Sequence, residues 1–302
     1  SKTVTVKNYS RLVEIDPELA LNKVRRVSAE NLEHTLRILR YNAEHEVDVY
    51  RFSSKLVPLA THPLLSRWDY IEDLKREFEA VGCYVKDMGM RVSFHPDHYT
   101  LINTPREDVF EASIRDLQHH CSMLEAMGLD EKCKLVIHVG GGYKDKKAAL
   151  KRFSSNIRRV PQKIVQRLTL ENDDKIYTAV EVLELCQKLS LPLVLDLHHH
   201  HCNNNGENLE DIIDDIFATW EGTGLPPKIH ISSPKSECAP RHHHDFINPE
   251  DLYPFLILAR DHCEHLDVMV EAKQKDKAVF QLVSELSNCP LIKQKGKTTL
   301  VI

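Results

Sequence analysis

The chain has 302 residues, 42% of them hydrophobic, and a formal net charge of −5 at pH 7. This length and composition allow a large buried core, and the negative charge provides no general attraction to nucleic acid. No apolar run reaches the roughly 18 residues of a membrane span, and eight scattered cysteines, with no CxxC pair and no signal peptide, indicate a reduced, cytoplasmic protein.

Seven short runs rich in Val, Ile and Leu recur along the chain. Continuous apolarity over four or five residues is typical of strands that are buried on both faces, as in parallel sheets. The runs begin at residues 47, 91, 134, 167, 191, 228 and 267 and read VDVYRFSS, RVSFHP, KLVIHVGG, RLTLEND, LPLVLDLHHH, KIHISSP and DVMVEAK.

Segments between the runs carry apolar residues at helical spacing. One stripe predicts a helix within 70–82 that ends at Gly82, a second predicts a helix within 182–189 before Pro192, and a third predicts one within 209–217. Strands that alternate with helices predict βα units and a parallel sheet. The expected fold is therefore an α/β TIM (β/α)₈ barrel.

Seven strands are one fewer than a closed (β/α)₈ barrel contains. The opening segment SKTVTVKNYSRLVEIDPELA contains no convincing buried strand. Either the barrel is incomplete, or a first strand precedes Ser1, and we favour the second explanation. No Pro/Gly/Ser-rich linker divides the chain, so we expect one TIM-barrel domain over residues 1–302.

Titratable residues lie at the ends of six of the seven runs, where TIM barrels place their chemistry. These residues are His95, His138, Glu171, Asp196 with His199, His230 and Glu271. A single histidine near a strand end is more often an ordinary core or loop residue, but six such strand ends are hard to explain by chance. Because a buried ring of carboxylates and imidazoles is costly without a cation, the pattern predicts a metal site.

The donor set narrows the choice of metal. Imidazole and carboxylate ligands without cysteine favour Mn²⁺, Zn²⁺ or Fe²⁺ over a thiolate site. The number of donors exceeds what one ion needs, so two or three ions that share bridging carboxylates would account for them. Such clusters are typical of enzymes that displace groups at phosphorus.

Two histidine-rich segments need separate interpretation. Within DLHHHH we expect Asp196 and His199 to bind metal, while the other three histidines lie around the site or face solvent. In APRHHHDFI, His243 could complete an outer metal site with His199, and an ordinary solvated polar loop is about as good an explanation of that segment.

Lys228 is an unusual residue beside a metal site. It alternates with His230 along a buried strand, so both side chains should point into the same space. A protonated lysine would be repelled there by the ions. Lys228 should therefore be neutral, modified or turned toward a phosphate.

Four ordered stretches resemble the bacterial ultraviolet-damage endonucleases. They are YRFSSKLVPLATHP at 50–63, SFHPDHYTL at 93–101, TLENDDKIYT at 169–178 and EAKQKDKA at 271–278, and IHVGGGYKDK and PKIHISSPKSE agree in register. The resemblance covers nearly the whole chain. It implies a TIM-barrel hydrolase that nicks DNA immediately 5′ of ultraviolet photoproducts, and also at abasic sites, with a three-ion cluster usually treated as Mn²⁺.

The resemblance also implies roles for particular residues. The implied metal ligands are His95 and His138 with a bridging Glu171, then Asp196, His230 and Glu271, and finally His199 with His243. Lys228 matches a family lysine that is carboxylated at its amine, which would make it anionic. Catalytic roles are expected for Lys228, Glu171 and Glu271.

The motif HPDHYT departs from the family pattern at one position. His98 stands where Gln is common, and that residue and the following aromatic, here Tyr99, are thought to wedge into the duplex in place of the damaged bases. Histidine can still stack and donate a hydrogen bond. We therefore expect His98 and Tyr99 to contact the lesion, with an effect on lesion preference.

Two other classes of protein explain part of the pattern. A sugar isomerase or epimerase of the xylose-isomerase type also has metal ligands at barrel strand ends, but HPDHYT and the pair His199 and His243 weigh against it. A metal-storage protein would leave Glu171 and Glu271 unexplained. The expected partner is thus double-stranded DNA with ultraviolet lesions, bound by a monomer that associates with the nucleoid and not with a membrane.

Overall fold

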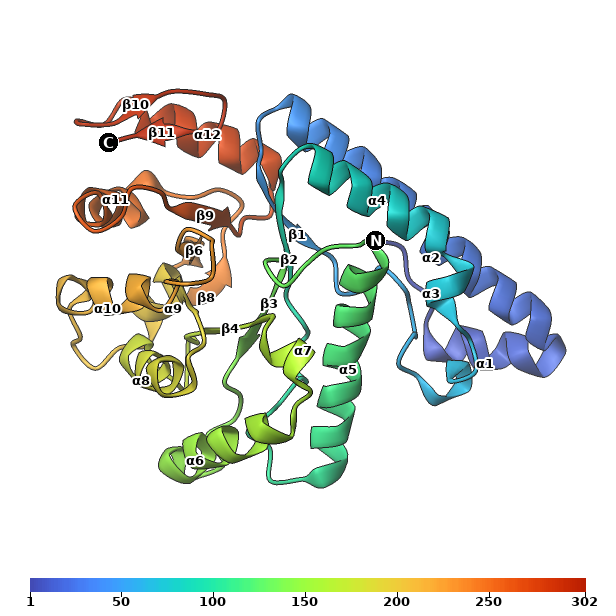
Figure 1. Cartoon of the computed structure of the whole chain (residues 1–302). Helices are drawn as coiled ribbons and strands as arrows, with labels where there is room; N and C mark the ends of the chain where they lie inside the picture. Colours follow the sequence, from blue (N-terminus) through green and yellow to red (C-terminus); the bar gives the residue numbers. More distant parts are fainter.

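The computed structural model describes residues 1–302 and contains a seven-stranded parallel sheet surrounded by helices (Figure 1). In spatial order the strands are β1 (Val49–Phe52), β2 (Arg91–Phe94), β3 (Lys134–His138), β4 (Leu168–Glu171), β5 (Leu193–Asp196), β6 (Lys228–Ile231) and β9 (Asp267–Val270). Each neighbouring pair runs parallel. All seven predicted strands are confirmed.

Helices connect and cover these strands. They are α1 (Val6–Ile15), α2 (Pro17–Glu44), α3 (Tyr70–Asp73), α4 (Lys75–Asp87), α5 (Glu107–Ala126), α6 (Lys146–Asn156), α7 (Gln162–Val165), α8 (Ala179–Leu189), α9 (Leu197–Cys202), α10 (Ile213–Ala218), α11 (Tyr253–Ala259) and α12 (Asp276–Leu286). None of them combines the length and apolar character required to cross a membrane.

Shorter elements complete the chain. Single 3₁₀ turns are η1 (Pro63–Leu65), η2 (Ile157–Arg159), η3 (Leu209–Asp211) and η4 (Pro249–Asp251), and two antiparallel hairpins pair β7 (Pro234–Ser236) with β8 (Ala239–His243) and β10 (Lys293–Gln294) with β11 (Leu300–Val301). The predicted helix within 209–217 is thus η3 followed by α10.

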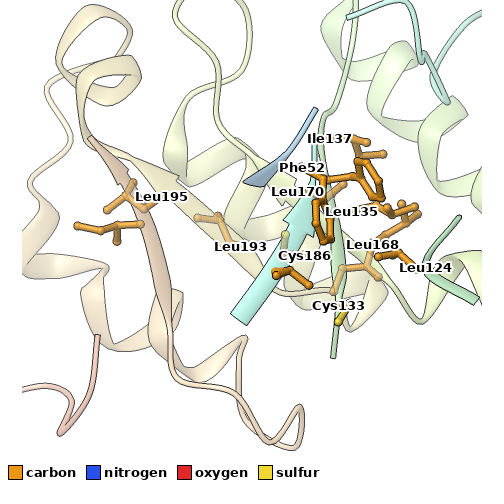
Figure 2. Packing of buried hydrophobic residues seen from close by; sticks show 14 of the residues in the cluster. Phe52, Leu124, Cys133, Leu135, Ile137, Leu168, Leu170, Cys186, Leu193 and Leu195 are labelled. Carbon is orange, nitrogen blue, oxygen red and sulfur yellow. The ribbon is translucent and has the colours of Figure 1, made fainter. Parts of the chain in front are cut away.

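The core lies between the strands and the surrounding helices. Figure 2 shows Leu135 and Ile137 of β3 packed beside Leu168 and Leu170 of β4, with Phe52 of β1 close by. These side chains are almost fully buried, as expected for strands of a parallel sheet that are covered on both faces. Burial of this apolar surface is the main stabilising contribution to the barrel.

The barrel is open on one side. β1 and β9 are the two end strands, and they lie near each other without a hydrogen-bonded ladder between them. A cavity of about 1710 Å³ lies along this seam, lined by both strands and by α2 and α12. An eighth strand of a closed barrel would belong between β9 and β1.

The N-terminal segment is helical. Thr5 caps α1, and Asp16 caps α2 by accepting hydrogen bonds from the backbone N–H groups of Glu18 and Leu19. The long α2 packs against α4, and Val24 on its first half contributes to a small separate core (Figure 1). The absence of a predicted strand in the first twenty residues therefore agrees with the structure.

The predicted end of a helix at Gly82 is wrong. Two helices occupy the segment, separated at Leu74, and α4 continues through Gly82 to Asp87. A Cβ at Gly82 would come within 1.7 Å of the carbonyl oxygen of Met127. The glycine is thus required by close packing against the end of α5, and it does not terminate the helix.

Candidate metal centre

Glu171, the last residue of β4, lies at the centre of a cluster of imidazoles. Its Oε2 is 2.8 Å from His95 Nε2 and 3.6 Å from His138 Nε2. Its Oε1 is 2.8 Å from His230 Nδ1 and 3.7 Å from His199 Nδ1. Burial would raise the pKa of Glu171, but the surrounding histidines, His230 and His138 above all, hold it well below its usual range.

Strand register explains why these residues meet. His138 on β3 pairs with Glu171 on β4, and Asp196 on β5 pairs with His230 on β6. Because neighbouring parallel strands end at the same edge, their last residues lie at one level of the barrel. The residues predicted from six strand ends are therefore brought to one place.

Asp196 links β5 to the short helix α9. Its Oδ1 caps the helix by accepting a hydrogen bond from His199 N at 2.8 Å, whereas Oδ2 is buried without a hydrogen-bond partner. Burial raises the pKa of Asp196 to about 6, and repulsion from Glu171 adds to the rise, against attraction to His199. Asp196 and His199 lie one helical turn apart and point to the same side, as their spacing predicts.

His199 is the histidine of the run that reaches the cluster. Burial disfavours its protonated form, but Asp196 and Glu171 outweigh burial and raise the pKa of His199 to about 9. His198 and His200 are buried residues of α9, and His201 of the same helix is exposed. One histidine in four thus contacts the central carboxylate.

Asn172 is a positioning residue that sequence reasoning missed. Its amide accepts a hydrogen bond from Asp196 N at 2.9 Å and donates one to Asp196 O at 3.0 Å. Its backbone oxygen lies 2.9 Å from His199 Nδ1, the ring nitrogen that also faces Asp196 Oδ2 at 3.6 Å, and this contact fixes the orientation of the imidazole. The only sequence signal was its place directly after Glu171.

Glu271 follows β9 and closes the cluster from the other side of the seam. Its Oε1 lies 3.3 Å from His230 Nδ1 and accepts a hydrogen bond from Arg51 Nη1 of β1. Burial would raise the pKa of Glu271, but His230 and Arg51 lower it. Arg51 was not identified from the sequence, although it lies within the motif YRFSS.

His243 comes from the exposed hairpin of β7 and β8. Its Nδ1 is 3.7 Å from Glu271 Oε2, so it meets the cluster through that carboxylate. Its ring lies perpendicular to the ring of His198, with centroids 6.0 Å apart. The segment that could have been a solvated loop is a hairpin that delivers one histidine to the site.

Lys228 lies deeper in the barrel than the cluster. It is 2% exposed, and its Nζ is 3.5 Å from Ser93 Oγ on β2. Burial lowers the pKa of Lys228 to about 7, and repulsion from Arg91 adds to this. Among the three sequence-based alternatives, these surroundings favour an uncharged amine over an ammonium that reaches a phosphate.

The two residues of the predicted wedge lie beside the cluster on the loop after β2. His98 and Tyr99 are exposed, and their rings are tilted against each other with centroids 4.0 Å apart. A cavity of about 360 Å³ lies between this loop and the cluster, and its lining includes His98, His138 and His199. The pair is thus within reach of a substrate that also meets the metal ligands.

The residues present fit divalent cations. Two groups bring ligand atoms within 4.8 Å of one another, His95 with His138 and Glu171, and Glu171 with Asp196 and His199. The groups share Glu171, and Asp196 Oδ2 is left buried and unpartnered. Imidazole nitrogens and carboxylate oxygens suit Mn²⁺ or Zn²⁺, and a cation would supply the partner that Asp196 Oδ2 lacks.

Distant solved structures share the fold alone. A 3-keto-D-glucoside 4-epimerase, YcjR, from E. coli is 15% identical with a TM-score of 0.56, covering 84% of this chain and 94% of its own. Endonuclease IV from Thermus thermophilus is also 15% identical, with a TM-score of 0.55, covering 84% of this chain and 95% of its own. Equal similarity to an epimerase and an endonuclease does not distinguish their activities.

Closer relatives resolve the family. The sequence pattern described as UV-endonuclease UvdE matches residues 1–301. A UV DNA damage endonuclease from Bacillus pumilus (strain SAFR-032) is 44% identical over 301 residues, 99% of this chain and 93% of that protein. The crystal structure of SacUVDE is 31% identical with a TM-score of 0.84, covering 95% of this chain and 92% of that chain. This chain belongs to the UV-endonuclease UvdE family of endonucleases.

Proposed function

We propose that the protein is a metal-dependent endonuclease that nicks double-stranded DNA immediately 5′ of ultraviolet photoproducts, both cyclobutane pyrimidine dimers and 6-4 photoproducts, and at abasic sites. The observation that carries the proposal is the buried carboxylate of Glu171, which two ligand groups share. A site with a shared carboxylate suits two or three neighbouring ions. The family membership indicates that the substrate is DNA.

The ligands divide into three sets. His95 and His138 would hold one ion with Glu171, Asp196 and His199 would hold a second with Glu171, and His230, Glu271 and His243 would complete the cluster. We propose Mn²⁺ as the metal, with Zn²⁺ as the alternative. Divalent ions in such a site activate water and stabilise the charge that develops on phosphate oxygens.

The chain's own residues prepare this site. Asn172 fixes Asp196 and His199, and Arg51 holds Glu271 in place across the seam. Lys228 lies below the cluster and is shielded from water, where we assign it a catalytic role with Glu171 and Glu271. Ordered ligands reduce the reorganisation needed when the substrate binds.

DNA recognition falls to the exposed pair beside the cluster. His98 and Tyr99 present two rings in contact to solvent, and inserted side chains of this kind unstack base steps and kink the duplex. We propose that the pair enters the duplex at the lesion. The protein would act as a monomer and as one TIM-barrel domain over residues 1–302, in the cytoplasm at the nucleoid.

Nicking of supercoiled plasmid tests this function. Ultraviolet-irradiated plasmid should be converted to the open circle with Mn²⁺ and should stay supercoiled with EDTA, and unirradiated plasmid should stay supercoiled in both. Glu171→Gln is the matched control for a contaminating nuclease. Equal nicking of irradiated and unirradiated plasmid, or nicking that persists in EDTA, would contradict the proposal.

A further inference from the structure

The loop between β2 and α5 combines an exposed tip with a buried base. Tyr99 is 69% exposed, whereas Thr100, the next residue, is 5% exposed and Asn103 is fully buried. The change from exposed to buried occurs within one residue. A loop that only connects two elements would not need to bury its polar side chains so completely.

Helix α5 holds the loop directly behind the tip. Thr100 Oγ1 donates a hydrogen bond of 2.7 Å to Asp116 Oδ2, and Leu101 N donates one of 2.8 Å to Ser113 Oγ. Because the acceptor at Asp116 is a carboxylate, its bond to Thr100 is of the stronger, charge-assisted kind. Both anchors lie within two residues of Tyr99.

Other elements hold the far part of the same loop. Asn156 Nδ2 donates to Ile102 O at 2.7 Å, and Asn103 Nδ2 donates to Gly141 O at 2.7 Å. Gly140, at φ +112°, passes so close that a Cβ there would lie 2.4 Å from Asn103 Oδ1. The loop is therefore tied to the segment that follows the metal ligand His138.

We propose that Asp116 is a positioning residue that acts through Thr100. Its carboxylate fixes the loop so that His98 and Tyr99 stand at a set distance from the metal cluster. A wedge held this way enters the duplex at a fixed number of nucleotides from the phosphodiester that is cleaved. This inference rests on the proposed function, and it adds a residue outside both the cluster and the tip.

The physical reason is pre-organisation. A freely moving tip would have to be ordered on each encounter with DNA, at a cost in conformational entropy. Displacement of the reacting group by about 1 Å can cost roughly 100-fold in rate. The bond between Thr100 and Asp116 removes much of this freedom before DNA arrives.

Paired substitutions test the anchor. Thr100→Val removes the hydroxyl and keeps the shape of the side chain, and Thr100→Ser keeps the hydroxyl. Asp116→Ala removes the acceptor, and Asp116→Asn keeps a neutral acceptor oxygen. Kinetics are measured on a duplex that carries one photoproduct, and a 2-aminopurine placed opposite the lesion reports unstacking in EDTA, where no cleavage occurs.

The expected result separates the hydroxyl from packing. Thr100→Val and Asp116→Ala should lower kcat/KM about 10- to 100-fold and reduce the 2-aminopurine signal, with Mn²⁺ binding unchanged. The kcat/KM of Thr100→Ser should stay within about threefold of the value for the parent protein. The kcat/KM of Asp116→Asn should lie between the values for the parent protein and Asp116→Ala. Asp116 is partly exposed, so Asp116→Ala decides the question if Thr100→Val does not fold.

Two outcomes would contradict the proposal that Asp116 positions the tip through Thr100. Parent-like kinetics and fluorescence in both Thr100→Val and Asp116→Ala would show that the tip needs no anchor. Equal losses in Thr100→Ser and Thr100→Val would show that packing, and not the hydrogen bond, sets the loop. Failure of the parent protein to nick the lesion duplex would instead contradict the proposed function, so the two failures are distinguishable.

Discussion

Buried charged side chains have different kinds of partner at the two ends of the barrel. At the N-terminal end, Arg91 of β2 donates hydrogen bonds to Asp267 of β9 at 2.5 Å and to Pro226 O at 2.9 Å, and its guanidinium lies 4.9 Å from the ring of Trp220. Lys134 there donates to a backbone carbonyl at 2.8 Å. The protein itself supplies a carboxylate, an aromatic ring and backbone carbonyls as partners of these cations, and only Nη2 of Arg91 is buried without a hydrogen-bond partner.

At the C-terminal end the partners are incomplete. Four imidazoles surround Glu171, yet Asp196 Oδ2 and His138 Nδ1 are buried without hydrogen-bond partners. Leaving a buried polar atom unpaired costs about 1–3 kcal/mol. The comparison teaches that neither a buried charge nor a single unpaired atom identifies a functional site, whereas several carboxylates and imidazoles that converge from separate strand ends do.

Removing the central carboxylate should have the largest effect. Glu171→Gln should lower the rate of nicking at least about 1,000-fold, equivalent to about 4 kcal/mol, because two metal sites lose a shared ligand. Plasmid nicking under metal-saturated conditions measures this. His201→Ala, which removes an exposed histidine from the same run, is the matched control and should nick normally. Substantial nicking by Glu171→Gln would show that the cluster at the C-terminal end does not depend on this shared carboxylate.

Breaking the pair at the opposite end should affect stability. Arg91→Met leaves Asp267 without its buried partner and should lower the free energy of unfolding by about 3 kcal/mol, as measured in urea. Arg26→Met, which removes a surface ion pair with Glu30, should change it by less than about 1 kcal/mol. Arg91→Met should still be stabilised by Mn²⁺, and loss of that response would show that the two ends are not independent.

The exposed tip should matter to DNA and not to stability. Tyr99→Ala removes a stacking surface worth about 1–3 kcal/mol, so kcat/KM on a lesion duplex should fall about 10- to 100-fold with the melting temperature unchanged. His98→Ala should act in the same direction. Tyr41→Ala, at an exposed tyrosine of α2, should leave the kinetics intact. If kcat/KM on the lesion duplex were the same in Tyr99→Ala, His98→Ala and the parent protein, the proposed insertion of these side chains into DNA would be contradicted.

His119 is a buried histidine outside the cluster, and its pKa is shifted mainly by burial. His119 of α5 bonds to Tyr70, and burial, with repulsion from His120, lowers its pKa from 6.5 to about 3. The unfolded chain therefore binds a proton between these values when the folded chain does not, so this contribution to stability is present above pH 6.5 and is lost as pH falls toward 3.

The variant His119→Gln removes the titrating group and so tests its contribution to the pH dependence of stability. The loss of stability from pH 7 to pH 5 should be smaller in His119→Gln than in the parent by about 1–2 kcal/mol, as measured by urea unfolding of metal-free protein at both values. An equal loss in the two proteins would show that His119 is not held neutral by burial.

Much of the barrel could be predicted because its signals are local. Each strand is a largely apolar run, and every predicted ligand except His243 lies at or just after the end of such a run, so chain order placed Glu171 and His230 at one level. Arg51 and Glu271 are 220 positions apart and form a pair only when the fold brings the two sides of the seam together, and no local pattern reports that. The helix end predicted at Gly82 was wrong for the same reason, since the role of this glycine depends on Met127, which directly follows α5.

Local patterns also could not predict the hairpin of β7 and β8 or the hydrogen bonds between Asn172 and Asp196. Polar residues such as those around His243 occur equally in hairpins and in loops. An asparagine after a strand is ordinary until its amide is seen to bond both backbone groups of Asp196. Positioning residues of this kind are defined by contacts in three dimensions.

The most direct test of the central claim is the number of divalent ions that the folded protein retains. Native mass spectrometry of Mn²⁺-loaded protein should show two or three bound ions, and Glu171→Gln should show fewer. Retention of no ion by the folded parent protein would contradict the claim that cations complete the partners missing at this end of the barrel.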